Sequence, residues 1–139
     1  MAAPNSTSTQ GSIDNPDTII IPVAALANLA NSQVLKIALP YAFAVTSALF
    51  RVGDKAATTA AKAATATVQI SGTAVTGGVI SLTSANATPS GAAVASTAIT
   101  GNNSTFTPGS TLEVAISSVT AFAEGDGWFE FTVLPTSAG

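Results

Sequence analysis

The stretch that decides the fold is Leu112–Leu134, which reads LEVAISSVTAFAEGDGWFEFTVL. Large apolar residues occupy every second position in both halves of this stretch: Leu112, Val114, Ile116, Phe129, Phe131 and Val133. A period of two is typical of β-strands that bury one face. The sequence Glu124-Gly-Asp-Gly between the halves supplies turn residues. We therefore predict a β-hairpin with an aromatic inner face and with Trp128 on its other side.

Similar short runs recur along the chain at intervals of about 8 to 12 residues, separated by turn residues. The runs that we expect to be strands are Thr18–Val23, Gln33–Leu39, Tyr41–Val52, Thr65–Ser71, Thr73–Thr76, Gly78–Thr83 and Ala92–Thr100. Pro22 places the first run at a sheet edge or at a strand end, and Ser71-Gly72 and Gly77-Gly78 are interpreted as turns. Ala24–Ala30 offers a single helical turn at most. The pattern predicts an all-β, antiparallel, jelly-roll-like β-sandwich.

Two segments lack the simple alternation of apolar and polar residues. Tyr41–Val52 carries apolar or small residues on both faces, Phe43 and Leu49 on one and Phe50 on the other, which predicts a strand deep in the sandwich. Gly53–Ala66 is rich in Ala and Lys and has helical propensity. Because it lacks an apolar stripe with which a helix docks, we favour a loop that leads into a strand.

The first 17 residues, Met1–Asp17, are mostly small, polar or Pro. Such a segment has little to bury, so we expect a flexible N-terminal arm at residues 1–17 and one β-sandwich domain at 18–139. The arm is interpreted either as a disordered tail or as a segment that becomes ordered along a partner. We find no signal-like leader and no apolar run of the roughly 18 residues that a membrane span needs, so we expect synthesis in the cytoplasm and no membrane partner.

Composition narrows the possible partners. Only 8% of residues are charged and the net charge is −3, so the chain lacks the basic surface with which proteins neutralise phosphates. We therefore expect no nucleic-acid partner. A sparsely charged chain with a mean hydropathy of +0.48 suits an assembled state better than a free monomer. A homo-oligomer is predicted.

The sequence offers little catalytic chemistry. It contains no His and no Cys, which removes the commonest general base, the thiol nucleophile and the usual zinc ligands. Glu124 and Asp126 form the one acidic cluster, but they lack the spacing of a calcium loop, so we favour solvated turn charges over a metal site. A glycosidase needs two facing carboxylates, and no such pair occurs outside this turn. We predict no enzyme, no cofactor and no metal.

Trp128 is the one Trp of the chain. Three interpretations remain open for it: packing beneath a loop or the other sheet, contact with another subunit, and stacking on a sugar ring.

Three stretches together resemble the head decoration, or capsid cement, proteins of tailed phages. They are ALANLANSQVLKIALPYAF (residues 25–43), TTAAKAATATVQISGTAVTGGVISLTSANATPSGAAVASTAIT (58–100) and LEVAISSVTAFAEGDGWFEFTV (112–133). The similarity lies in the overall residue composition and in the order of the segments, from about Thr18 onward. It implies a jelly-roll-like sandwich that assembles as a homotrimer on the outer surface of the capsid, in the virion, and clamps neighbouring subunits of the major capsid protein.

Candidate contacts with the capsid or with a sister subunit are the apolar residues of the arm and of the first strand, together with two aromatic residues. They are Pro4, Ile13, Pro16, Ile19, Ile21, Tyr41 and Trp128. The alternative is a phage fibre or tail-tip module that binds a receptor or a glycan. That function requires an aromatic-lined groove, for which Tyr41 and Trp128 are the candidates.

Overall fold

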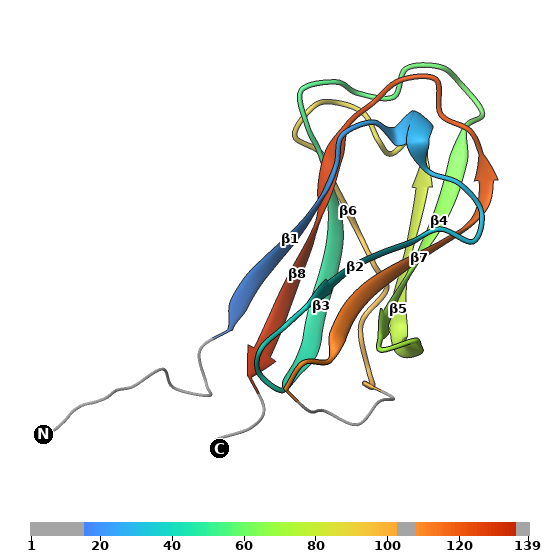
Figure 1. The fold of residues 1–139 in the computed structure, drawn as a ribbon. Coiled ribbons are helices and arrows are strands. Elements are labelled where there is room, and N and C mark those ends of the chain that lie inside the picture. The colour runs from blue at the N-terminus through green and yellow to red at the C-terminus, as the bar shows by residue number, and fades with distance from the viewer. Residues whose placement is uncertain (1–15, 103–107, 136–139) are drawn as a thin grey trace, which may run out of the picture.

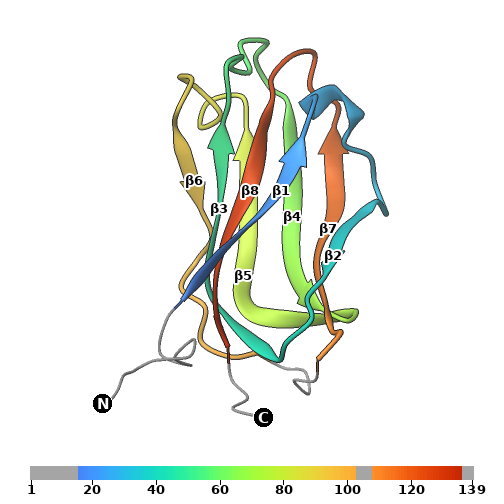
Figure 2. The same cartoon turned by 60° about the vertical axis from the view of Figure 1, so that its left-hand side comes forward.

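The computed structural model describes residues 16–102 and 108–135, which form eight strands and one 3-10 turn, η1 (Leu26–Asn28). The strands are β1 (Asp17–Val23), β2 (Val34–Ala38), β3 (Phe43–Val52), β4 (Ala63–Ile70), β5 (Thr73–Thr83), β6 (Ala93–Ala95), β7 (Thr111–Thr120) and β8 (Gly127–Pro135). They build two four-stranded antiparallel sheets, β1-β8-β3-β6 and β2-β7-β4-β5, which pack face to face (Figures 1 and 2). The predicted all-β sandwich is confirmed.

The strand pairs reveal a jelly roll. β1 pairs with β8, β2 with β7, β3 with β6 and β4 with β5, so the chain first doubles back on itself around the β4–β5 turn. Two further pairings, β3 with β8 and β7 with β4, roll this long double strand into two sheets. An eight-stranded double sheet of this kind is the jelly-roll arrangement. The described ends of the chain therefore lie side by side, with Asp17 opposite Val133.

The core lies between the sheets and is built by the alternating residues that the sequence marked. Phe43, Phe50, Phe129 and Phe131 of β3 and β8 are fully buried, and the rings of Phe50 and Phe129 meet edge to face at 5.1 Å. The other sheet contributes aliphatic residues: Val68, Ile70, Ile80, Leu82, Leu112, Val114 and Ile116. Burial of large apolar side chains of this kind is the main favourable contribution to folding.

β7 and β8 do not form a hairpin, so that prediction is wrong. They belong to different sheets, and residues 121–126 carry the chain across the end of the sandwich between them. Phe122, which is 2% exposed, turns into the core in this connection. Because each strand is amphipathic by itself, the alternation fits two strands that face each other across the core as well as two strands in one sheet.

β3 buries one face only, which corrects the prediction of two buried faces. Its pairing with β8 shifts between Val45 and Ser47, the sign of a β-bulge. The extra residue reverses the alternation, so that Phe43 before the bulge and Phe50 after it both point into the core. Asn102 braces the bulge, since its side chain accepts a bond from the Val45 amide at 2.8 Å and donates to the Val45 carbonyl at 3.0 Å.

Ser71-Gly72 forms the predicted turn, but Gly77-Gly78 does not. β5 runs through the two glycines with a shift in register against β4. Gly77 has φ +90°, and a Cβ at this position would collide with the carbonyl oxygen of Ala98. The segment after β6 approaches so closely because it bonds along the β5 edge, where Thr76 donates to Gly101 at 2.7 Å. β6 is accordingly shorter than the predicted strand Ala92–Thr100.

The remaining predictions fall into two groups. β1 is an edge strand, Ala24–Ala30 contains a single turn, and residues 53–62 form a loop before β4, as expected. The predicted arm lies almost entirely outside the described residues and stays a prediction.

Candidate interaction surfaces

The outward surface of the β1-β8-β3-β6 sheet, here called the outer face, combines apolar side chains with an ion pair. Pro22 of β1, Trp128 of β8 and Arg51 of β3 stand opposite one another in register. Next along the sheet is a second row, formed by Ile20, Glu130 and Leu49. Ile20 is 50% exposed, the highest exposure among the large apolar residues of the described chain. A sheet edge that carries such a residue is open to further contact.

Trp128 is held in place by charged neighbours. Its indole Nε1 donates to Glu130 Oε1 at 2.7 Å, and Arg51 Nε lies 3.4 Å from the same oxygen. The hydrogen bond from Trp128, followed by that from Arg51, lowers the pKa of the Glu130 carboxyl below its ordinary value. Arg51 also donates through Nη1 to the Gly91 carbonyl at 3.3 Å. Trp128 is thus half-buried on the outer face and does not pack between the sheets.

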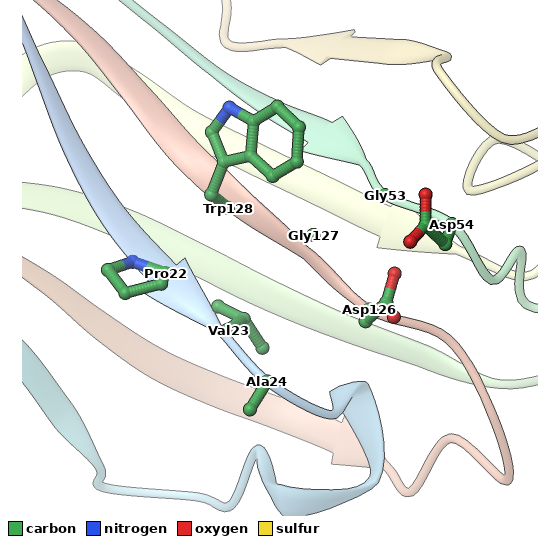
Figure 3. A pocket seen from close by; sticks show the side chains of 8 residues that line it. All are labelled: Pro22, Val23, Ala24, Gly53, Asp54, Asp126, Gly127 and Trp128. Carbon is green, nitrogen blue, oxygen red and sulfur yellow. The ribbon is translucent and has the colours of Figure 1, made fainter.

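A shallow groove of about 250 Å³ opens beside Trp128, and we call it the Trp128 groove. It is lined by Pro22, Val23, Ala24, Gly53, Asp54, Asp126, Gly127 and Trp128. Figure 3 shows Trp128 and Pro22 toward one end of the groove and the carboxylates of Asp54 and Asp126 toward the other. Gly127 also lines the groove, and a Cβ there would collide with the Arg51 carbonyl oxygen and the buried ring of Phe50.

The carboxylates of Glu124 and Asp126 lie at the surface, as expected for turn charges, and they also brace a loop. Glu124 Oε2 accepts bonds from the Thr58 and Thr59 amides at 2.9 and 2.8 Å, and Oε1 accepts the Thr59 hydroxyl at 2.7 Å. These bonds, those from Thr59 first, lower the pKa of Glu124. Asp126 Oδ1 accepts the Lys55 amide at 3.1 Å. In the described part of the chain, no three His, Cys, Asp or Glu residues come together as a metal site would require.

The predicted contact residues on β1, Ile19 and Ile21, both lie on the inner side of the sheet. Pro16 is exposed before the strand, and Ile19 is half-buried on its inner side. Ile21 is 7% exposed and belongs to the core, so its side chain is occupied within the molecule, which corrects its choice as a contact. The isoleucine of β1 that points outward is Ile20. The sequence signal for it is its distance of two residues from Pro22, because side chains two positions apart lie on the same face of a strand. Pro4 and Ile13 lie outside the described residues.

Tyr41 lies at the opposite end of β1 from Trp128. Its hydroxyl donates to Asp17 Oδ2 at 2.8 Å, which ties the β2–β3 loop to the first residue of β1. Burial, followed by this bond, raises the pKa of Tyr41 to about 12. Asp17 and Pro22 are five residues apart on β1, or roughly 17 Å at the rise of a strand. Tyr41 and Trp128 therefore do not line one groove.

A second hollow follows the seam where the free edges of β1 and β2 approach each other. It is lined by Pro22, Val23, Ala24, Ala25, Asn28, Leu29, Gln33 and Leu35. Ile37 of β2 points toward the core beyond this hollow but remains 38% exposed. This side of the sandwich is less closed than the opposite one, where the chain after β6 bonds to β5.

The sequence analysis did not identify Ile20 as an exposed residue. It also missed the contacts of Glu130 with Arg51 and Trp128, and the position of Asp54 and Asp126 in one groove. No helix within residues 16–102 and 108–135 has the length and hydropathy needed to span a bilayer. Comparisons with protein-family models, curated proteins and solved structures find no match to this chain.

Proposed function

We propose that the protein is a virion structural protein, a decoration or cement protein that binds the outside of a tailed-phage head and clamps neighbouring major capsid subunits. The observation that carries this proposal is the exposed Ile20 on β1, a strand whose outer edge pairs with no other strand of the described residues. An edge strand can pair with an extended segment of a partner, and an apolar side chain beside it adds buried surface. The resemblance to decoration proteins supports the major capsid protein as the partner.

Binding at this edge stabilises a shell without turnover. A specific interface buries about 800 Å² on each partner. Because the cement protein binds the assembled shell and not its separated subunits, mass action favours the assembled state. Many copies on one head multiply this effect against the outward pressure of packaged DNA. We propose a homotrimer as the binding unit, since three copies present three such edges to the joints between capsid subunits.

A structural role also agrees with how the acidic residues are used. Glu124, Asp126 and Glu130 each accept hydrogen bonds from the loops or strands beside them. These carboxylates hold the fold together, which supports a binding protein over an enzyme.

The test is co-sedimentation with expanded capsids that lack the protein. The full chain should bind saturably, and a chain that starts at Asp17 should bind more weakly because it lacks the arm. Ile20→Lys should weaken binding by about tenfold or more, as loss of a central apolar anchor does. Val79→Lys is the matched control, since Val79 is 41% exposed on β5 of the other sheet and should not affect binding.

Two results would contradict the proposal. One is a full-length chain that never binds shells but is retained on cell surfaces, which would favour the fibre or tail-tip function. The other is equal loss of binding in Ile20→Lys and Val79→Lys, which would show that β1 has no special part in the contact. Sedimentation equilibrium of the isolated protein tests the trimer directly.

A further inference from the structure

The indole ring of Trp128 forms a fixed platform at the Trp128 groove. Its Nε1 is already occupied by Glu130 Oε1, at 2.7 Å, and Glu130 is in turn held by Arg51. The ring therefore offers a ligand its π-face and no hydrogen-bond donor. Pro22 stands beside it in register on β1 and extends the apolar surface. A flat C–H surface of a ligand fits such a platform.

The other end of the groove offers hydrogen-bond acceptors. Asp54 is exposed, and the half-buried Asp126 uses Oδ1 to hold the Lys55 amide. An ionised carboxylate accepts hydrogen bonds but donates none. Gly53 and Gly127 also line the groove and carry no side chain. The complementary ligand has an apolar face at one end and several hydroxyl donors at the other.

Charge around the groove selects against anionic ligands. Asp54 and Asp126 repel an anion that enters the groove. At about 250 Å³ the groove is also smaller than the roughly 300–1,000 Å³ of sites for drug-sized ligands. It is suited to one small ring.

We propose that the Trp128 groove binds a neutral pyranose unit of a glycan, with the sugar ring stacked on Trp128 and its hydroxyls donating to Asp54 and Asp126. This activity goes beyond capsid attachment. The groove opens at the β3 and β8 ends near Gly53 and Gly127, whereas Ile20 lies further along β1. A decoration protein with this site would display a sugar-binding surface on each copy.

The test uses Trp128 as its own reporter. Because the chain has a single Trp, its intrinsic fluorescence reports on this groove alone. The protein is titrated with methyl glucoside, methyl galactoside, methyl mannoside and N-acetylglucosamine, and with glucuronate as an anionic counterpart. We expect a saturable change with at least one neutral sugar and at least about tenfold weaker binding of glucuronate.

Variants are then compared by calorimetric titration with the neutral sugar that binds. Trp128→Ala should weaken binding by about tenfold or more, whereas Trp128→Phe, which keeps an aromatic face, should retain more of it. Asp54→Ala should also weaken binding and leave the fold unchanged, which keeps the test valid if Trp128→Ala fails to fold. Leu134→Ala, on the same strand and outside the groove, is the matched control.

Several outcomes would overturn the sugar site. They are no response to any neutral sugar, equal affinity for glucuronate and neutral sugars, and undiminished binding in Asp54→Ala together with Trp128→Phe. Loss of shell binding in Asp54→Ala without sugar binding by the native chain would instead assign the groove to the capsid. Sugar binding that persists in Ile20→Lys, while shell binding is lost, would show that the two proposals concern separate sites. Failure of one proposal would then leave the other unaffected.

Discussion

Tyr41 joins two parts of the chain that are distant in sequence. Its hydroxyl donates to Asp17 Oδ2 at 2.8 Å, and burial is the larger cause of the rise in its pKa to about 12. The sequence marked Tyr41 as a contact residue, but its hydroxyl is used inside the molecule. The partner Asp17 is 24 residues away, a separation that no local pattern encodes.

Spectrophotometric titration should show this environment directly, because Tyr41 is the one Tyr of the chain. We expect the phenol of the folded protein to ionise at about pH 12, against an ordinary value of 10.0. In Asp17→Asn the midpoint should fall but stay above 10.0, since burial remains. Because the pKa of Tyr41 is raised in the folded state, its contribution to the free energy of unfolding is complete below about pH 10. This contribution is lost as the pH rises through about 12.

The control for this titration is the chain in concentrated urea, in which Tyr41 should ionise near its ordinary value. A native midpoint that matches the unfolded one would show that the contact with Asp17 does not form in solution.

At the scale of single elements, irregularities decide which faces are buried. The bulge near Val45 places both ends of β3 in the core, and the glycine pair in β5 lets the chain after β6 approach that strand. Asn102 satisfies both backbone groups of Val45, at a place where β6 no longer pairs with β3. The sequence showed two-sided apolar character in β3 but not the bulge that explains it, because a bulge shifts the alternation without a distinctive residue.

Alanine at Gly77 tests the close approach in β5. Ala in the left-handed region costs about 1–2 kcal/mol by itself. At Gly77, with φ +90°, the added Cβ also collides with the Ala98 carbonyl, which should cost about 1–3 kcal/mol more, as overpacking does. Urea unfolding should show the loss as a lower midpoint with an unchanged slope.

Gly72→Ala is the matched control for this substitution. Gly72 has a similar φ of +87° but open space around its Cβ position, so only the backbone cost should appear. Equal losses in the two variants would rule out the collision with Ala98.

At the scale of the whole molecule, the jelly roll makes nearly every strand pair with a distant partner. β1 pairs with β8, so the sandwich closes only when the two described ends of the chain meet. Such long-range pairing carries a loop-closure cost before its contacts form. The same closure leaves β1 and β2 as free edges on one side, where the exposed Ile20 lies.

Refolding should therefore be slow for a chain of this size. After dilution from urea, we expect Trp128 fluorescence to recover over milliseconds to seconds, the range of all-β sandwiches, and not over microseconds. Stopped-flow measurement checks this rate, and far-UV circular dichroism should follow the same time course if folding is two-state. Microsecond recovery would mean that local contacts dominate folding, which is incompatible with this strand order.

The sequence by itself determined the class of fold, the approximate position of most strands and the inward faces of the regular strands β7 and β8. Side chains alternate along an extended backbone whatever lies beside it, so Leu112, Phe129 and Phe131 could be assigned to the core from spacing alone. Pro22 likewise excluded a central position in a sheet, because it has no amide to donate.

Only the tertiary structure decided which strands pair and which polar groups meet. β7 and β8 have the alternation of a hairpin, yet they lie in different sheets, because an amphipathic strand buries its apolar face equally well in either. The contacts of Trp128 with Glu130 and of Glu130 with Arg51 depend on the register between β3 and β8, as the Trp128 groove depends on the meeting of β1, β3 and β8 ends. Register is fixed by packing across the whole core, and a local sequence pattern does not contain it.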